Sequence, residues 1–285
     1  MNELTSIIIP FYNGNPVFLR NAVISVKKLR KAKVELIIVD DGSCNVFSIK
    51  NLIKQCDVDF DVKILNHQNN LGIAAARNTA ILNASGKWLL WLDCDDTLDE
   101  RCIEIMREQH DDEYMIIGEC NVYEKGSVLL RDPSVFFDLG RKHIRTPYDP
   151  FMTNIFSIQP QLVRRDAVLD MGMFDTNYVF AEMTDFFLRF LTYYGMSKIS
   201  TVHGAYYNYN RDNENSVSRN RTQLEKYRYK TLYTYKNANK IPVDDILYLG
   251  RCVNTCTQLY VATIGKKIFL QPYISFNNNN LRIGE

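Results

Sequence analysis

The sequence has no run of about 18 consecutive apolar residues, the length that a membrane-spanning helix needs. Its first residues, MNELTSIIIP, lack the basic segment and the long apolar core of a signal peptide. The seven cysteines include no C-x-x-C pair and form no finger-like pattern with the four histidines, which favours a reduced protein. A formal net charge of +1 gives no reason to expect nucleic-acid binding. We therefore expect a cytoplasmic protein without a nucleic-acid partner.

Three common motifs of α/β proteins are also missing. The first predicted strand is not followed by G-x-G-x-x-G, and neither a G-x-x-x-x-G-K-[ST] phosphate loop nor a G-x-S-x-G nucleophile motif occurs. A phosphorylated ligand would then need neutralisation by something other than glycine-rich backbone amides. Carboxylates that hold a divalent cation are the remaining device.

The first hundred residues do contain a repeated pattern of short β-branched runs and helical stretches. The apolar runs are LTSIIIP, VELIIVDDGS, DVKILNHQNN and GKWLLWLD, and helices are predicted at about 17–31 and over NVFSIKNLIKQ and LGIAAARNTAILNA. Near-continuous apolar runs that alternate with helices predict a parallel, right-handed α/β sheet. In such sheets ligands bind beyond the carboxyl ends of the strands. The polar clusters FYNGN, DDGS, HQNNLG and DCDD should therefore meet at one rim.

The last of these clusters is the most informative, because Asp93, Asp95 and Asp96 fall within four positions. Residues two apart on a strand share a face, so Asp93 and Asp95 can face one cation while Cys94 points away. The alternative is that the acids only cap a helix that begins near Asp99. A cap accounts for one or two of these acids but not for the spaced pair. The pattern therefore favours an Mn²⁺ or Mg²⁺ site.

The second half is less regular. YMIIGECNVYEKGSVLL predicts a strand hairpin that turns at Gly126, and a long loop follows to about residue 150. AEMTDFFLRFLTYYG predicts an amphipathic helix that stops at Gly195. From about Arg219 two further helical stretches are expected. We thus predict a domain over 1–218, with halves at 1–100 and 101–218, and a helical extension over 219–285.

A basic run, SVKKLRKAKV, lies near the end of the first predicted helix. The simpler interpretation is the solvated C-terminus of a surface helix, where cations suit the helix dipole. The alternative is attraction to an anionic membrane face, which would give peripheral membrane contact.

Five segments in order resemble the family 2 glycosyltransferases with the GT-A fold. They are SIIIPFYNG, IIVDDGS, NNLGIAAARN, LLWLDCDDTL and VRRDAVLDMGMFD, and the resemblance covers roughly residues 5–218. It implies an α/β GT-A fold, with a mostly parallel sheet flanked by helices, and an inverting transfer of a sugar from a nucleotide donor. The first hundred residues would form the nucleotide-binding half, and residues 101–218 the acceptor-side half.

The resemblance also implies roles for individual residues. Tyr12 would stack on the base, Asp41 would accept a hydrogen bond from it, which favours uracil, and Arg77 would reach the base and phosphates. Asp95 would ligate the metal, with Asp96 as its near equivalent, and Arg211 would clamp the diphosphate. The implied donor residues are Pro10, Tyr12, Asp40, Asp41, Gly72, Arg77, Asn78, Asp93 and Arg211, and the implied metal ligands are Asp93, Asp95 and Asp96.

The sequence departs from the family at two places. The family's carboxylate base follows a Glu in a segment like E-D-x-D-x-x-L-R, and here the segment AEMTDFFLR has Met183 at that position. Glu182 is the first candidate base and Asp185 the second, and loss of activity is a third alternative. In YNRDNENSVS, Asn213 stands where the family pattern Y-R-x-H-x-x-S has histidine.

Together these features predict a metal-dependent enzyme that moves a sugar from a UDP-sugar to a hydroxyl of a glycan or lipid-linked glycan. We expect it to act in bacterial surface polysaccharide synthesis, in the cytoplasm or at the inner face of the cell membrane. The alternatives are a catalytically inactive sugar-nucleotide-binding module and a nucleotidyltransferase, although FYNGN makes a poor glycine-rich phosphate loop.

Overall fold

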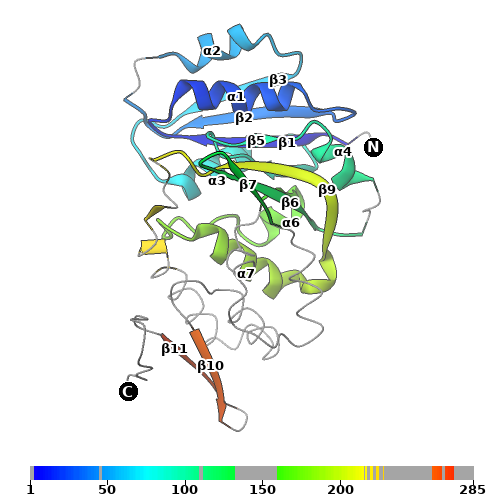
Figure 1. Cartoon of the computed structure of the whole chain (residues 1–285), viewed down its shortest axis with the longest axis vertical. Helices are drawn as coiled ribbons and strands as arrows, with labels where there is room; N and C mark the ends of the chain where they lie inside the picture. The colour runs from blue at the N-terminus through cyan, green and yellow to red at the C-terminus, as the bar shows by residue number, and fades with distance from the viewer. Residues whose placement is uncertain are drawn as a thin grey trace.

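The computed structural model describes most of the chain. The described residues are 3–44, 47–108, 112–131 and 159–214, the positions 216, 219, 220, 223, 224 and 227, and the segments 259–264 and 267–272. Apart from the last two segments, they form a twisted sheet with helices on both sides (Figure 1). The long loop predicted up to residue 150 lies largely outside the described residues.

The sheet has nine strands, in the order β3-β2-β1-β4-β8-β6-β9-β5, with β7 paired to β6. The first four strands in this order are parallel to one another, β8 runs antiparallel to β4 and β6, and β9 runs parallel to β6. This arrangement confirms the predicted α/β class. The strands are β1 (Thr5–Phe11), β2 (Val34–Asp40), β3 (Asp61–Asn66), β4 (Trp88–Trp91), β5 (Thr97–Leu98), β6 (Met115–Glu124), β7 (Ser127–Arg131), β8 (Gln161–Arg164) and β9 (Ile199–Asn210).

Helices cover both faces of the sheet. The helices α1 (Pro16–Lys27) and α2 (Ile49–Cys56) lie above it in Figure 1, and α6 (Arg165–Asp170) and α7 (Glu182–Tyr194) lie below. The α3 helix (Ile73–Asn83) packs against β1 and β2, and α4 (Cys102–Arg107) packs against β9. The first helix begins where the sequence chemistry requires, because the Asn15 side chain caps it and Pro16 follows.

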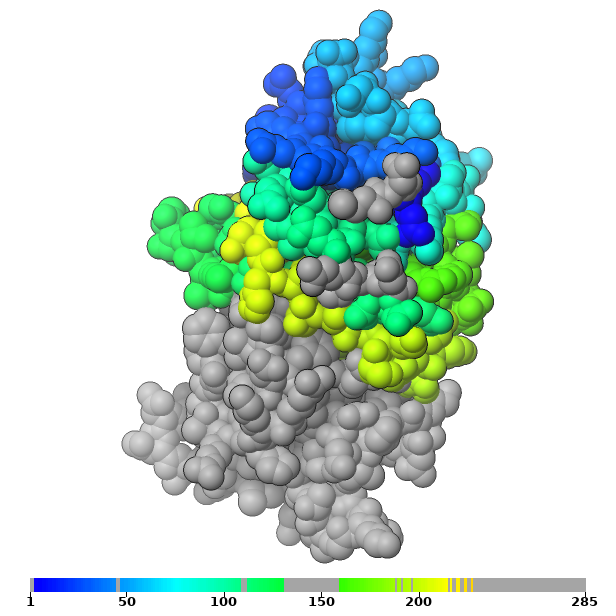
Figure 2. All heavy atoms as spheres, turned by 90° about the vertical axis from the view of Figure 1, so that its right-hand side faces the viewer, coloured from blue at the N-terminus to red at the C-terminus, as the bar shows by residue number. Residues whose placement is uncertain are grey.

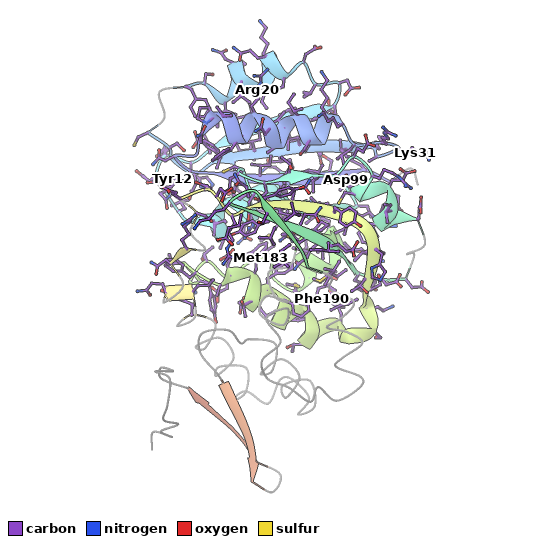
Figure 3. The ribbon with its side chains drawn as sticks, viewed as in Figure 1. Tyr12, Arg20, Lys31, Asp99, Met183 and Phe190 are labelled. Atoms are coloured by element: carbon purple, nitrogen blue, oxygen red, sulfur yellow. The ribbon has the colours of Figure 1, made fainter. Side chains whose placement is uncertain are left out.

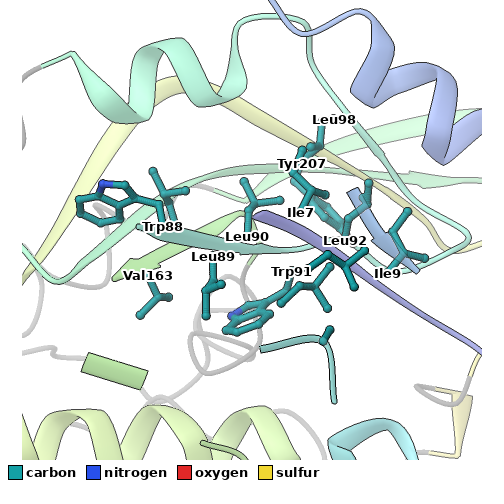
Figure 4. Packing of buried hydrophobic residues seen from close by; sticks show 14 of the residues in the cluster. Ile7, Ile9, Trp88, Leu89, Leu90, Trp91, Leu92, Leu98, Val163 and Tyr207 are labelled. Carbon is teal, nitrogen blue, oxygen red and sulfur yellow. The ribbon is translucent and has the colours of Figure 1, made fainter. Parts of the chain in front are cut away.

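The centre of the sheet is buried on both faces, which explains the near-continuous apolar runs. All residues of β4 are buried, as are Ile7–Ile9 and Leu36–Val39. Figure 4 shows Trp91 pointing down toward the helices while Tyr207 and Leu98 pack above the strand. The Trp91 ring makes edge contacts with Phe174 and with Phe186 of α7, at 5.2 and 5.8 Å between centroids. Burial of these aromatic side chains fixes α7 beneath the end of β4.

Three of the five cations in the basic run have acidic partners. Lys27 pairs with Asp57, Arg30 with Glu100 and Lys31 with Glu104. Lys31 lies at the right of Figure 3, at the opposite end of the strands from Tyr12. The same end faces the viewer in Figure 2, where residues of the first half are stacked above those of 160–210. These pairs favour the surface-helix interpretation. No helix of the described segments is long and apolar enough to cross a bilayer.

The prediction of a wholly helical extension is wrong for residues 259–272. Strands β10 (Leu259–Ile264) and β11 (Lys267–Pro272) pair antiparallel there. The sequence LYVATIGKKIFLQP has β-branched and aromatic residues on either side of a glycine, and this is a hairpin pattern. The remainder of the predicted extension lies mostly outside the described residues, although Tyr227 contacts Phe180, with 5.7 Å between ring centroids.

A buried carboxylate joins three segments at the end of the sheet where β1 begins. Glu35 of β2 accepts hydrogen bonds from the Ser6 hydroxyl at 2.6 Å and the Ser85 amide at 2.6 Å, and Lys63 lies 2.9 Å from its other oxygen. Burial alone would raise the pKa of Glu35, but the hydrogen bonds from Ser6, Lys63 and Ser85 outweigh it and lower this pKa below its ordinary value of 4.5.

We expect the Glu35→Gln variant to lower the free energy of unfolding at pH 7 by about 1–3 kcal/mol in urea titrations, because a charge-assisted network is lost. Since the folded-state pKa is depressed, this contribution is complete above the ordinary pKa and disappears as the pH falls through the folded-state value. The difference from the unaltered protein should therefore shrink below about pH 4. Glu100→Gln, which removes an exposed pair with Arg30, is the matched control and should change stability by less than about 1 kcal/mol. A pH-independent effect of Glu35→Gln would contradict the explanation.

Candidate active site

The first part of the rim lies where β1 and β2 end. Tyr12 follows β1 and has half of its surface exposed, as a stacking residue requires. Asn13 has a positive φ of 49°, its amide donates to the Ser43 hydroxyl, and its side-chain oxygen accepts from the Cys44 amide. Asp40, the last residue of β2, accepts from the Ser43 amide at 3.0 Å. These bonds tie the FYNGN and DDGS segments together and present Tyr12 at the surface. Pro10 lies inside β1, in register with Val39.

Asp41 binds the loop that precedes α3. Its Oδ1 accepts from the Leu71 amide at 2.9 Å, and its Oδ2 accepts from the Gly72 amide at 2.8 Å. Gly72 has a φ of 93°, which a residue with a side chain rarely adopts. At Gly42, a Cβ would lie 2.5 Å from the backbone of Asn69, so glycine permits this close approach. The predicted convergence of the DDGS and NNLG segments is therefore present in the structure.

The acidic cluster forms a tight turn directly after β4. The Asp96 amide donates to the Asp93 carbonyl at 3.1 Å, which closes the turn. Asp96 itself is buried, and its two oxygens accept from the Tyr207 hydroxyl and the Asn210 amide, both at 2.7 Å. The Tyr207 hydroxyl also accepts from the Asp93 amide at 3.1 Å. Asp96 therefore anchors the turn to β9, and the N-terminus of α4 has no side-chain cap.

Asp93 and Asp95 remain the outward-facing members of the cluster. The side chain of Asp93 is 39% exposed, and Asp95 accepts a hydrogen bond from the Asn213 amide group at 2.6 Å. Burial, and next the charge of Asp93, raise the pKa of Asp95. Burial raises the pKa of Asp96 still more strongly, with smaller contributions from Asp95 and Asp93. A hollow of about 310 Å³ borders Asp95, with Asn208 of β9 in its wall.

Arg77 connects the acidic turn to α7. This side chain is only 2% exposed, and its two terminal nitrogens bind Asp93 at 3.1 Å and Glu182 at 2.6 Å. Its guanidinium also lies over the Phe174 ring, 5.3 Å from the centroid. Burial alone would lower the pKa of Arg77, but the charges of Glu182 and Asp93 outweigh it and raise this pKa. The buried Arg77 thus brings together two carboxylates, Asp93 and Glu182, that are 89 positions apart in the sequence.

The two candidate bases have different surroundings. Glu182 is the first residue of α7 and follows Ala181, which has a φ of 59°. It lies at the rim beside Arg77. Asp185 is buried and binds Arg189 one turn along the same helix at 2.7 Å. Met183 is buried in the core. The structure therefore places Glu182 in the site and uses Asp185 within α7.

Two other residues have structural partners that the sequence did not indicate. Both polar atoms of the Asn78 side chain bind the backbone of Phe174, at 2.8 and 2.9 Å. Arg211 binds Glu124 at 3.0 Å, and its amide donates to the Tyr123 carbonyl. Contact of either side chain with a donor stays a prediction.

Among the described residues, no group of three or more His, Cys, Asp or Glu side chains is arranged to hold a metal ion. Asp96 is bound to Tyr207 and Asn210, which leaves Asp93 and Asp95 as the pair next to one another. Mg²⁺ or Mn²⁺ that bridges a diphosphate needs only one or two protein carboxylates. The chemistry of this pair fits such an ion when the diphosphate supplies further oxygens.

Sequence reasoning missed Tyr207 and the contact of Asn213 with Asp95. Tyr207 is buried in an otherwise polar strand end, YYNYN, and this local pattern does not reveal its partner. Asn213 was noted only as a departure from histidine, yet its amide group donates directly to the predicted metal ligand. The side-chain amide of Asn213 is a hydrogen-bond donor, and this was the feature of the sequence that could have indicated the contact with Asp95.

Comparison with known proteins agrees with this geometry. Residues 6–171 match the family model described as Glycosyl transferase family 2. The chain belongs to glycosyltransferase family 2. This match confirms the family inferred from the five sequence motifs. It ends before Glu182, so it covers the acidic turn and Arg77 but not the start of α7.

Named relatives of this family 2 glycosyltransferase differ in what they act on. The glycosyltransferase GlyG of Streptococcus pneumoniae is 32% identical over 44% of this chain, and the match spans only 42% of GlyG. The cholesterol galactosyltransferase of Borreliella burgdorferi is 27% identical over 95% of this chain and 74% of its own length. The putative teichuronic acid biosynthesis glycosyltransferase TuaG of Bacillus subtilis is 25% identical over 84% of this chain and 89% of its own.

A solved structure confirms the GT-A fold. S. aureus TarS 1–349 in complex with UDP-GlcNAc superposes with a TM-score of 0.64 at 19% identity, and the match covers 87% of this chain and 72% of TarS 1–349. At this identity the likeness shows the shared fold alone.

We expect Tyr207→Phe to lower the free energy of unfolding by about 1–3 kcal/mol, because the Asp93 amide and the buried Asp96 carboxylate each lose a partner. Urea unfolding measures this change. Tyr193→Phe, at a tyrosine that is 59% exposed, is the matched control and should stay within about 0.5 kcal/mol. Equal effects at the two tyrosines would show that Tyr207 does not anchor the turn.

Proposed function

We propose that this protein is a metal-dependent, inverting glycosyltransferase that moves a sugar from a UDP-sugar to a hydroxyl of a glycan acceptor. The observation that carries the proposal is the buried Arg77, which binds Asp93 of the acidic turn and Glu182 of α7 together. Arg77 thereby binds both a carboxylate proposed to contact the sugar nucleotide and the candidate base. Membership of glycosyltransferase family 2 supports the reaction class.

The rim of β1 and β2 suits the nucleotide. The exposed Tyr12 offers an aromatic face for stacking, and Asp41 offers a carboxylate acceptor. Uracil has a hydrogen on N3, which can donate to such an acceptor, so the site favours UDP. The related TarS structures bound to UDP-GlcNAc and to UDP support a donor of this kind.

Asp93 and Asp95 are the residues that would hold Mn²⁺ or Mg²⁺. Burial, and next the neighbouring carboxylates, raise the pKa of Asp95 and Asp96. A nearby positive charge would therefore stabilise the ionised form of these side chains. The ion, when bound, stabilises the charge that grows on the diphosphate as it leaves. Asn213 orients Asp95 through its 2.6 Å hydrogen bond, and the Tyr207–Asp96 pair fixes the turn itself.

Glu182 is the proposed base. Arg77 binds its Oε1, and no described residue donates to its Oε2, which can accept the proton of the acceptor hydroxyl. The hydroxyl oxygen then forms a bond to the anomeric carbon while the bond from that carbon to the diphosphate oxygen breaks. Attack from the face opposite the leaving group inverts the anomeric configuration. The proton ends on Glu182, and UDP carries away the electron pair.

For the acceptor we propose a glycan or lipid-linked glycan of a bacterial surface polysaccharide, handled in the cytoplasm or at the inner membrane face. The names of two relatives support this proposal. TuaG is assigned to teichuronic acid biosynthesis, and the Borreliella enzyme is a cholesterol galactosyltransferase. Transfer to a surface polymer and transfer to a lipid are thus both represented among relatives that match most of this chain.

The donor proposal is tested by thermal unfolding with nucleoside diphosphates, with and without Mn²⁺. At 100 times its Kd, a ligand stabilises the folded state by about 2.7 kcal/mol, which corresponds to a rise in Tm of about 5–10 °C. We expect this rise with UDP and Mn²⁺ together, and its loss in Asp95→Asn. Asp57→Asn, at a fully exposed residue after α2, is the matched control and should respond as the unaltered protein does. Equal responses to all nucleotides, or no effect of Mn²⁺, would contradict the proposal.

The catalytic proposal is tested by initial-rate measurements of sugar transfer. Removal of a general base lowers turnover by about 10²–10⁴-fold, and we expect this loss in Glu182→Gln with the UDP response retained. Asp185→Asn should keep its turnover per folded molecule, because Asp185 is buried and binds Arg189 within α7. An active Glu182→Gln beside a folded but inactive Asp185→Asn would reverse the assignment. UDP binding without any transfer by the unaltered protein would favour an inactive sugar-nucleotide-binding module.

A further inference from the structure

A largely buried histidine lies beside Asp41, the carboxylate proposed to bind the base, whose side chain is 4% exposed. His67 follows β3 directly, and its side chain is only 10% exposed. Its Nδ1 lies 2.6 Å from Asp41 Oδ1, and its Nε2 lies 2.9 Å from the Thr79 hydroxyl on α3. Both contacts join side chains only. Thr79 of α3, His67 and Asp41 therefore form a hydrogen-bonded series that runs from α3 to the rim.

Most of the hydrogen-bond acceptor positions of the Asp41 carboxylate are occupied. A carboxylate has about four acceptor positions, and three of them here receive His67, the Leu71 amide and the Gly72 amide. Oδ1 takes two of these donors and Oδ2 takes one. Among the residues that the structure describes, no further donor reaches this carboxylate, so a single acceptor position remains, on Oδ2. The three donors also prevent the carboxylate from rotating, because each of its oxygens is held by at least one hydrogen bond.

The hydrogen-bond network assigns the proton positions on His67. Its Nδ1 faces an acceptor-only carboxylate and therefore carries a hydrogen. In a neutral imidazole Nε2 is then an acceptor, and the Thr79 hydroxyl donates to it. Thr79 lies two positions after Arg77 on α3, so one helix positions both the Arg77 bridge and the Asp41 carboxylate.

We infer that His67 is a positioning residue for uracil recognition: it holds Asp41 so that its one remaining acceptor position faces N3–H of the base. The inference rests on the proposed UDP-sugar donor. Uracil presents a hydrogen at N3, whereas cytosine presents a lone pair there, and a fixed carboxylate acceptor repels that lone pair. The Leu71 and Gly72 amides hold one oxygen each, and His67, positioned by Thr79, takes the second acceptor position of Oδ1, so that the base is directed to Oδ2.

The test measures the Kd of UDP and of CDP, each with Mn²⁺, by isothermal titration calorimetry of the full chain. The variants are His67→Leu, which removes the donor, His67→Asn, whose amide nitrogen can replace Nδ1, and Thr79→Val, which removes the partner of Nε2. His203→Ala is the matched control, because this histidine of β9 is 66% exposed and binds Glu119 instead. Selectivity is the ratio of the two Kd values.

A hydrogen bond to a charged group is worth about 10–100-fold in binding, so the unaltered protein should prefer UDP to CDP by about 10-fold or more. His67→Leu should lose about 10-fold of this ratio, Thr79→Val should lose part of it, and His67→Asn should keep most of it. A merely structural brace would lower Tm without changing the ratio. If His67→Leu does not fold, His67→Asn and Thr79→Val decide the matter.

The outcomes separate the two proposals. Failure of the unaltered protein to bind UDP would overturn the proposed function itself. UDP-selective binding that is unchanged in folded His67→Leu, or unchanged in Thr79→Val when His67→Leu does not fold, would overturn only the role of His67. Loss of selectivity in His67→Leu with its retention in His67→Asn and His203→Ala would support the inference.

Discussion

The arrangement of this site depends on one buried guanidinium. Arg77 is almost without solvent contact, and an unpaired cation there would be strongly unfavourable, so the folded state must bring carboxylates to it. The acidic turn after β4 supplies Asp93, and α7 supplies Glu182. The contacts that order the rim therefore also stabilise the folded state.

Around this centre, other side chains restrict the carboxylates that face a ligand. Asp96 and Tyr207 hold the acidic turn on β9, Asn213 binds Asp95, and His67 binds Asp41. The acidic side chains of the rim, from the partly exposed Asp93 to the buried Asp41, are thus oriented by hydrogen-bond donors behind them. Preorganisation of this kind lets a site bind a charged ligand without reorganising at the moment of reaction.

Much of the fold was predictable from local patterns. The apolar runs of β1, β2 and β4 are near-continuous because both faces are covered, and the hairpin at Gly126 has the expected turn residue. The partners of Arg77 and Asp96 were not predictable, since Glu182 and Tyr207 are 105 and 111 positions away and their contacts depend on tertiary packing. The C-terminal error had a local cause, because LYVATIGKKIFLQ has a strand pattern within a stretch interpreted as helix.

The reach of the family match has a consequence for how such chains diversify. It stops at residue 171, so it includes Arg77 and the acidic turn, whereas Glu182, the partner of Arg77 on α7, lies beyond it. Here α7 opens with Glu-Met, and the methionine has joined the hydrophobic interior. The first turn of α7 can therefore change while Arg77 and the acidic turn are kept. Two proteins that share Arg77 and this turn can then differ in the residue that accepts the proton.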